Sequence, residues 1–440
     1  MDREIHVYLD LERTQLRVGT LWARSRPGRE NASFEYDPGW LAHPKAFPLE
    51  PALPLNRGQM HTKRKLFATF TDAAPDRWGE ILLQRNEDRR TKKLGHVGRT
   101  LLAADFLIGV EDETRMGALR FKNSPDGPFL SKSGVPVPPL IELRKLLSAA
   151  NRVAKGKETD EDLQLLLAPG SSLGGQRPKA SVRDTDGSLL LAKFPRDNDK
   201  WSVPRWEAVA LALAEQAHIT VPRWRLEYPT KAKPALITKR FDRSGVDVRI
   251  PFMSALTASN SNDNEGGSYL DIAEVLRQEG IAPTEDLMQL WRRMVFNILI
   301  SNADDHLRNH GFVWIGGWRL SPAYDLNPYP DKRGFHAIAF NETDRDASIE
   351  VALSVAPSFG LSDNEAAGIV LEVAEAVKNW RVEAKRTGLG RAEIDRMAMA
   401  FEHDHLEQAL AMVPPPAHAK KPIARRRESA NKRPRAKAHA

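Results

Sequence analysis

The sequence predicts an α+β fold of two lobes, one rich in strands and one mostly helical, behind a small N-terminal α+β domain. Two observations carry this prediction: short strand candidates broken by Pro and Gly fill the first half of the chain, and helical periodicity dominates the second. Mixed strands followed by helices are expected of a β-rich lobe packed on a helical one. The hydrophobic fraction of 41% and the charged fraction of 28% are typical of globular chains.

A chain of 440 residues is too long for one ordinary core. We predict an N-terminal α+β domain (1–125), a β-rich lobe (126–242), a helical lobe (243–412) and a disordered basic tail (413–440). Residues 418–440 contain nine Lys or Arg and one Glu, so most of the net charge of +7 lies in the tail and the rest is nearly neutral. We expect this tail to be solubilising rather than a specific DNA-binding arm.

The individual elements follow in chain order. Strand candidates begin near residue 5, and Asp76-Arg77-Trp78-Gly79 leads into a short helix. Helical spacing with Pro at its entry predicts a helix over 139–153. An apolar strand over 189–192 ends at Lys193, because Pro195 cannot continue inside a central strand.

The second half begins with a buried helix over 206–217 and a strand over 235–241. A helix with apolar residues from 287 to 299 delivers the chain to 302–306, and Gly316-Gly317 marks a hairpin between strands 312–315 and 318–320. Two further helices are predicted over 365–384 and 393–412.

Several function classes are excluded by composition. The chain has no cysteine, so it forms neither disulfides nor thiolate sites, and the cytoplasm is the default location. The charged N-terminus has no signal-peptide core, and no apolar run reaches membrane-spanning length.

The polar motifs suit phosphoryl transfer, which needs backbone donors and a cation on phosphates, a carboxylate for the attacking hydroxyl, and oxygen ligands for Mg²⁺. Small residues at Ser172, Gly174 and Gly175, followed by Lys179, let the backbone approach phosphate oxygens. Lys193, at a strand end, needs an anionic partner, and Glu207 on the next helix is placed to orient it.

The sharpest signal is the interval of five residues between Asp304 and Asn309, which matches the catalytic loop of protein kinases. Asp304 would orient the hydroxyl proton, and the Asn309 carbonyl suits a hard cation. Asp325 follows the predicted hairpin, where a metal-binding Asp would fall. His306 and His310 have a zinc-ligand spacing, but Leu307 replaces the glutamate of a metalloprotease motif, so both are expected to be structural.

Five motifs together resemble the HipA toxin kinases and stand in the family's order. They are Ser-Leu-Gly-Gly-Gln-Arg-Pro-Lys (172–179), Leu-Ala-Lys-Phe-Pro (191–195), Lys-Arg-Phe-Asp-Arg (239–243), Asn-Ala-Asp-Asp-His-Leu-Arg-Asn (302–309) and Ala-Tyr-Asp-Leu (323–326). The segments 75–79 and 117–121 resemble the family's N-terminal region, so only the basic tail lies outside the resemblance.

The resemblance implies a serine/threonine protein kinase that uses ATP and Mg²⁺. It implies that Lys193 holds ATP phosphates, Asp304 is the catalytic base, and Asn309 and Asp325 bind Mg²⁺. Backbone groups of Lys239 through Phe241 would hold adenine. Family members are inactivated by autophosphorylation of a loop serine, which Ser171 matches best, with Ser172 as the alternative. Asp305 stands where some relatives have glycine, so it is the alternative to Asp304 as the base.

The resemblance also implies partners: a small helix-turn-helix antitoxin, DNA reached indirectly through it, and a protein substrate such as an aminoacyl-tRNA synthetase, with no membrane. Two alternatives stay open. Small-molecule kinases can share the Asp-to-Asn interval and the later Asp. A nucleic-acid-binding module driven by the basic tail is the other.

Overall fold

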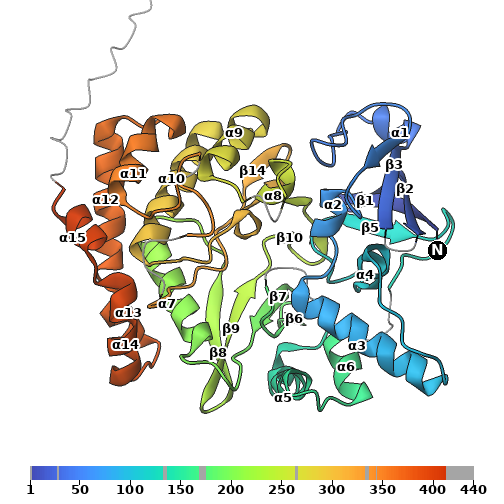
Figure 1. Ribbon diagram of the computed structural model, residues 1–440, viewed down its shortest axis with the longest axis horizontal. Coiled ribbons are helices and arrows are strands. Elements are labelled where there is room, and N and C mark those ends of the chain that lie inside the picture. Colours follow the sequence, from blue (N-terminus) through green and yellow to red (C-terminus); the bar gives the residue numbers. More distant parts are fainter. Residues whose placement is uncertain are drawn as a thin grey trace, which may run out of the picture.

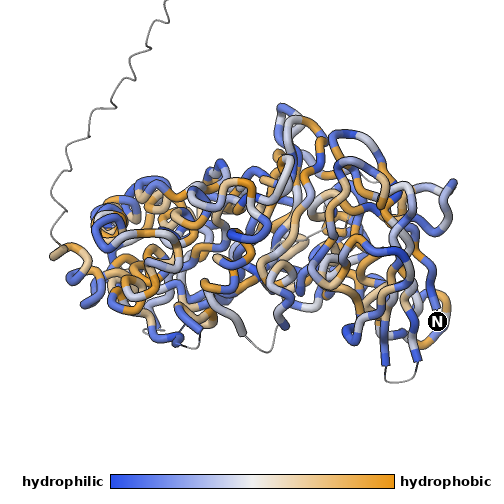
Figure 2. The backbone as a smooth tube through the Cα atoms, turned by 90° about the horizontal axis from the view of Figure 1, so that it is seen from above, coloured by the Kyte–Doolittle hydropathy of each residue, from blue (hydrophilic) through white to orange (hydrophobic). Residues whose placement is uncertain are grey.

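The computed structural model describes residues 2–26, 29–131, 136–167, 175–262, 266–331, 336–342 and 344–412. Ser171, Ser172, Gly174 and the basic tail lie outside these residues. Figure 1 shows an N-terminal part (blue to cyan), a β-rich lobe (green) and a helical lobe (yellow to red), and Figure 2 shows hydrophobic segments inside with hydrophilic turns outside. The α+β, two-lobed class predicted from the sequence is confirmed. The exact domain boundaries stay predictions.

The N-terminal part is built on a five-stranded antiparallel sheet of order β4-β3-β2-β1-β5. Alternating Ile5, Val7 and Leu9 are buried on one face, as the two-residue period of a strand requires. Its strands are Arg3–Leu11 (β1), Thr14–Arg26 (β2), Arg29–Tyr36 (β3), Met60–Thr62 (β4) and Leu119–Lys122 (β5). Its helices are Pro38–Leu41 (α1), Ala68–Asp72 (α2), Arg77–Lys93 (α3) and Ala103–Gly109 (α4).

The β-rich lobe is a four-stranded antiparallel sheet of order β6-β7-β9-β8. The strand that was predicted to end at Lys193 does so, and the predicted helix over 139–153 is a short 3₁₀ turn (η1, Leu140–Glu142) followed by α5. The strands are Lys179–Arg183 (β6), Leu189–Lys193 (β7), Trp224–Thr230 (β8) and Lys233–Lys239 (β9), and the helices are Leu143–Ala154 (α5), Asp160–Leu167 (α6) and Val203–Gln216 (α7).

The helical lobe surrounds a small sheet of order β12-β13-β14. The predicted hairpin is confirmed, with Gly316 in the left-handed region that its turn requires. Its elements are Arg243–Ser244 (β10), Val248–Arg249 (β11), Phe252–Ser254 (β12), Ala255–Ala258 (α8), Tyr269–Glu279 (α9), Pro283–Leu299 (α10), Leu307–Asn309 (η2), Gly311–Trp314 (β13), Trp318–Leu320 (β14), Ile349–Val355 (α11), Ala356–Phe359 (η3), Asp363–Val377 (α12), Trp380–Arg386 (α13), Arg391–Phe401 (α14) and Asp404–Leu410 (α15).

Two helices that were predicted to be continuous are each divided into two. The helix predicted over 365–384 is divided into α12 and α13, and the helix predicted over 393–412 into α14 and α15. At the second break, His403 has an extended backbone and so cannot belong to a helix. Trp380, which begins α13, stacks on Phe401 at a centroid distance of 4.7 Å, so tertiary packing overrides a continuous helical pattern.

The apolar interior consists of two clusters. The larger one joins the N-terminal sheet and α2 to α7 and the helical lobe. The smaller one joins Trp78 and Leu82 of α3 to α5, α6 and one face of the β6-β7-β9 strands. The N-terminal part therefore belongs to both cores.

Candidate active site

Lys193 lies at the centre of the candidate site, at the end of β7 between two carboxylates. Its Nζ atom is 2.5 Å from Oε1 of Glu207, on α7, and 2.9 Å from Oδ1 of Asp325, in the segment after β14. Burial works against the charge of Lys193, but Asp325 and Glu207 overcome it and raise the pKa of the ammonium above its ordinary value. The lysine is therefore a fixed cation.

Asp325 has a backbone in the left-handed region, with φ of 60°, a conformation that Asp tolerates better than most residues. Its Oδ1 atom also accepts a hydrogen bond of 3.1 Å from Nδ2 of Asn327. Burial works against its charge, yet Lys193 and Lys179 hold the pKa of Asp325 well below its ordinary value. Asp325 is thus a permanent carboxylate, as a metal ligand must be.

A cavity of about 540 Å³ opens between the β-rich lobe and the segment that carries Asp325. Six of the residues predicted from the sequence line it, and they are Gly175, Lys179, Lys193, Glu207, Asp304 and Asp325. A second cavity of about 30 Å³ shares Lys193, Glu207 and Asp325 with the first. Lys239 and Phe241 line this smaller one, so the predicted adenine-binding segment lies beside the predicted phosphate-binding residues.

The two adjacent carboxylates of the catalytic loop have different environments. Asp304 is exposed and faces the large cavity. Asp305 is fully buried, where it accepts hydrogen bonds from Tyr269 Oη and, at 3.0 Å, from Asn297 Nδ2, and pairs with His310 Nε2 at 3.0 Å. Only Asp304 can meet a substrate, so the geometry favours Asp304 over Asp305 as the base. His310 is buried, which fits the structural role expected for it.

Asn309 has the donor atom that a hard cation needs. Its Nδ2 atom donates to the carbonyl oxygen of Asp304 at 3.3 Å, which leaves Oδ1 as the remaining polar atom of the side chain. Within the part of the chain that the structure describes, this buried Oδ1 atom has no hydrogen-bond partner. An orphaned buried acceptor fits a Mg²⁺ ligand, since burial without a partner is costly.

Among the described residues, no group of three or more His, Asp or Glu side chains is arranged to hold a metal ion alone. In nucleotide-dependent enzymes, Mg²⁺ is usually held by one or two protein oxygens together with phosphates. Asn309 and Asp325 fit that arrangement.

Lys179 has a partner that the sequence did not predict. Its Nζ atom lies 2.7 Å from Oδ2 of Asp76 at the start of α3, more than 100 residues earlier in the chain. Lys179 lines the cavity but is held by the N-terminal part. The motif at 75–79 predicts the start of a helix, and nothing in its spacing indicates a contact with Lys179.

The connection between the lobes, which follows the predicted adenine-binding segment, is held by buried ion pairs. Asp242 is fully buried, and its Oδ2 atom accepts from Arg240, Arg243 and the backbone N–H of Gly117, at 2.6, 2.6 and 2.8 Å. Burial works against ionisation, but the two guanidinium groups hold the pKa of Asp242 far below its ordinary value.

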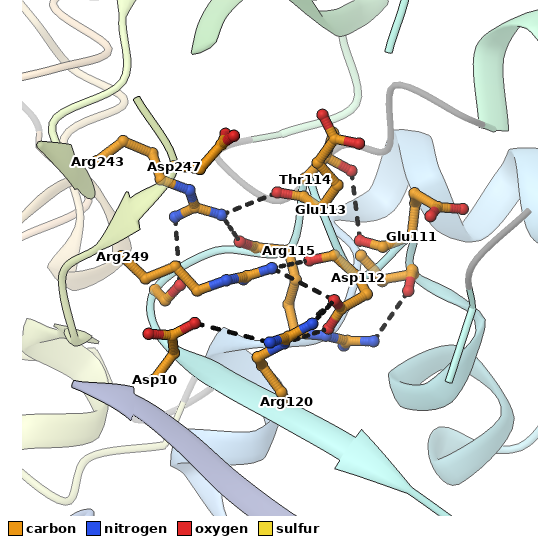
Figure 3. A network of polar contacts seen from close by, with 12 residues as sticks. Asp10, Glu111, Asp112, Glu113, Thr114, Arg115, Arg120, Arg243, Asp247 and Arg249 are labelled. Atoms are coloured by element: carbon orange, nitrogen blue, oxygen red, sulfur yellow. Dashed lines mark hydrogen bonds and ion pairs between the residues drawn. The ribbon is translucent and has the colours of Figure 1, made fainter. Parts of the chain in front are cut away.

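Figure 3 shows how this connection meets the N-terminal part, where Arg120 and Arg249 converge on Asp112 and Arg243 donates to backbone carbonyls of residues 113 and 115. These contacts hold the segment that follows Lys239 and Phe241, and no motif in the sequence predicts them.

The fold is α+β and has two lobes. Lys193, Glu207 and the metal-binding candidate Asp325 meet where the lobes join, and Asn309 in the catalytic loop is the second metal-binding candidate. These features define the kinase-like class. Comparison with known proteins identifies the family: the HipA N-terminal domain matches residues 9–110 and the HipA-like C-terminal domain matches residues 171–380. The chain belongs to the HipA family.

Individual relatives agree with this. Y4mE of Sinorhizobium fredii, named as a candidate kinase, is 23% identical over 391 residues, 81% of each chain. Y4dM of the same organism, named likewise, is 34% identical over 122 residues, 26% of this chain and 29% of its own. The HipA of Shewanella oneidensis, solved with HipB and operator DNA, matches with a TM-score of 0.61 and 16% identity over 93% of this chain and 96% of that one. Among the described residues, no helix has the length and apolarity needed to cross a bilayer.

Proposed function

We propose that this protein is an ATP-dependent serine/threonine protein kinase that transfers the γ-phosphoryl group to a hydroxyl of another protein. The observation that carries the proposal is Lys193, held between Glu207 and Asp325 in the wall of a cavity that Asp304 also faces. Membership of the HipA family and the kinase names of its relatives support the same class.

Each residue has a part that its geometry allows. The ammonium of Lys193 binds phosphate oxygens, and Glu207 positions that ammonium. Asp304 accepts a hydrogen bond from the attacking hydroxyl and orients it toward the γ-phosphorus. Asn309 and Asp325 would hold Mg²⁺, which when bound neutralises charge on the transferred group. The backbone from Lys239 to Phe241 binds the adenine ring.

The finer features rest on the family. We propose a small helix-turn-helix antitoxin as the partner, with DNA bound through it, because the matched Shewanella oneidensis protein was solved with HipB and operator DNA. We propose further that Ser171, or else Ser172, is autophosphorylated as an off switch, and that the substrate is an aminoacyl-tRNA synthetase whose phosphorylation arrests translation and growth. A dianionic phosphate on a loop that binds ATP phosphates would repel them.

Incubation of the purified protein with γ-labelled ATP, Mg²⁺ and a cell lysate tests the proposal. We expect labelled proteins with the natural chain and none with Asp304→Asn, because the exposed Asp304 orients the hydroxyl. Asp162→Asn is the control, because Asp162 pairs with Arg152 away from the cavity. Label in small molecules but in no protein would favour a small-molecule phosphotransferase. Activity that needs the basic tail but not Asp304 would favour a nucleic-acid-binding module.

A further inference from the structure

The proposed chemistry leaves unexplained the segment from Asp72 to Trp78, which connects α2 to α3 in the N-terminal part. This segment contacts both lobes on the two sides of the candidate active site. It contains the first four residues of the motif Pro75-Asp76-Arg77-Trp78-Gly79, and none of its residues lines the large cavity. We call residues 72–78 the bridging segment.

One end of the bridging segment binds the β-rich lobe. In the carboxylate of Asp76, Oδ1 accepts from the backbone N–H of Gly79 at 2.9 Å and caps α3, while Oδ2 pairs with Lys179 Nζ at 2.7 Å. The side chains of Lys179 and Asp76 are only 3% and 8% exposed, so this is a desolvated ion pair. Trp78 Nε1 donates to the carbonyl oxygen of Lys179 at 3.1 Å. Both contacts hold the start of β6.

The other end binds the helical lobe beside the catalytic loop. Asp72 accepts hydrogen bonds from the backbone N–H and Oγ of Ser254, at 2.7 and 2.8 Å. Its carboxylate is also 3.7 Å from Nη1 of Arg308, which lies between Asp304 and Asn309 in the sequence. The carbonyl oxygen of Arg308 accepts from Tyr324 Oη at 2.8 Å, next to Asp325. Asp72 is thus tied to both acidic segments of the site.

The bridging segment is itself held firmly. The fully buried Arg115 donates from Nη1 to the carbonyl oxygen of Ala73 at 2.9 Å. Ala73 packs in the larger apolar cluster and Trp78 in the smaller one. Within these few residues the chain passes from one core to the other, and Figure 1 shows α2 and α3 between the N-terminal sheet and the β-rich lobe. A short, anchored segment of this kind transmits position rather than absorbing movement.

We infer that the bridging segment is a positioning device that fixes the separation of the two lobes, with Asp76 and Asp72 as its positioning residues. It holds Lys179 and the catalytic loop in the relation that phosphoryl transfer needs, and in this sense the inference rests on the proposed function. Since a misplacement of about 1 Å costs catalysis up to about 10²-fold, a loosened bridge lowers kcat even though neither Asp touches ATP.

Interlobe distances in the full chain test this inference. Because the chain has no cysteine, Ala232→Cys in the exposed β8–β9 turn and Glu279→Cys at the exposed end of α9 give two unique spin-label sites. Double electron–electron resonance then measures the separation of the lobes without nucleotide and with AMP-PNP and Mg²⁺. The backgrounds are the natural sequence, Asp76→Asn, Asp72→Asn and the control Asp162→Asn.

We expect a narrow distribution for the natural sequence and Asp162→Asn, and a distribution at least about twice as wide for Asp76→Asn and Asp72→Asn. Autophosphorylation of both bridge variants should show kcat reduced by about tenfold or more. Asn caps a helix as well as Asp does, so Asp76→Asn keeps α3 and is expected to fold. Circular dichroism checks this, and Asp72→Asn provides a second variant that leaves the cap of α3 untouched.

Distributions in both bridge variants that match the natural sequence would overturn the inference. A natural chain that binds no AMP-PNP would refute the proposed function instead, and the distances alone would then still decide whether the segment fixes the lobes.

Discussion

Lys179 and Lys193 face each other on the neighbouring strands β6 and β7 and line the same cavity, yet their carboxylate partners come from different parts of the chain. Lys193 pairs with Glu207 and Asp325, which belong to the two lobes of the kinase-like fold. Lys179 pairs with Asp76 of the N-terminal part. One cation is positioned by the proposed catalytic machinery and the other by an added domain. The N-terminal part therefore supports the cavity wall through Lys179 without lining the cavity itself.

The largest expected effect is a difference in the loss of activity when each of these two lysines is replaced. Lys193→Met should lower kcat/KM for ATP by about 10²–10³-fold, because it removes a preorganised cation from between the buried Glu207 and the partly buried Asp325. Lys179→Met should lower it by only about tenfold, because Lys179 acts through its tie to Asp76. Steady-state kinetics of autophosphorylation measures both. Equal losses in the two variants would contradict the distinction.

A smaller effect concerns the two adjacent carboxylates of the catalytic loop. Asp305→Asn should lower the free energy of unfolding by about 3 kcal/mol, because His310 and Tyr269 lose a buried partner. Asp304→Asn should leave the stability within about 0.5 kcal/mol, since its side chain is exposed. Denaturant unfolding monitored by circular dichroism measures both values. Destabilisation by Asp304→Asn as large as that by Asp305→Asn would show that the loop is organised differently.

The smallest expected effect is a change of folding stability with pH, which has opposite signs for Glu50 in the N-terminal part and Asp325 at the cavity. Burial raises the pKa of Glu50 to about 7, so the folded chain keeps a proton that the unfolded chain releases at its ordinary pKa near 4.5. The contribution of protonated Glu50 to the free energy of unfolding is complete below pH 4.5 and is lost as the pH rises through 7. Between pH 5 and pH 7 the free energy of unfolding falls by about 2 kcal/mol from this cause. Asp325 has the opposite sign: its pKa is lowered, and its contribution is lost as pH falls below its ordinary value.

Unfolding free energies at several pH values, for the natural chain and Glu50→Gln, isolate the first contribution. Glu50→Gln should remove the loss of stability between pH 5 and pH 7, because an amide does not titrate there. An unchanged slope in Glu50→Gln would assign the titration to another group.

The sequence was informative where chemistry is encoded locally. A strand that ends in lysine, the catalytic-loop motif with Asp304, and a hairpin followed by Asp325 predicted three residues that the structure brings to one cavity, whereas Asn309 of the same motif does not line it. Their catalytic and binding roles stay predictions, as do those of Ser171, Ser172 and Gly174, which lie outside the described residues. The HipA family, expected from the five motifs, is confirmed by the family matches.

Features set by distant contacts could not be predicted. The pairs Asp76–Lys179 and Asp72–Arg308 join residues more than 100 positions apart, and no local periodicity encodes them. The division of two predicted helices also involves distant contacts, because Trp380 at the start of α13 stacks on Phe401 at the end of α14. Burial of Asp305 beside the exposed Asp304 likewise depends on Tyr269 and Asn297, which precede the loop.

A crystal structure of the natural chain with AMP-PNP and Mg²⁺ tests the central claim most directly. The account predicts phosphate oxygens within hydrogen-bond distance of Lys193 Nζ, a Mg²⁺ ion bound by Asn309 Oδ1 and a carboxylate oxygen of Asp325, and adenine against Lys239 to Phe241. Nucleotide bound elsewhere, or a Mg²⁺ ion that contacts neither Asn309 nor Asp325, would contradict it.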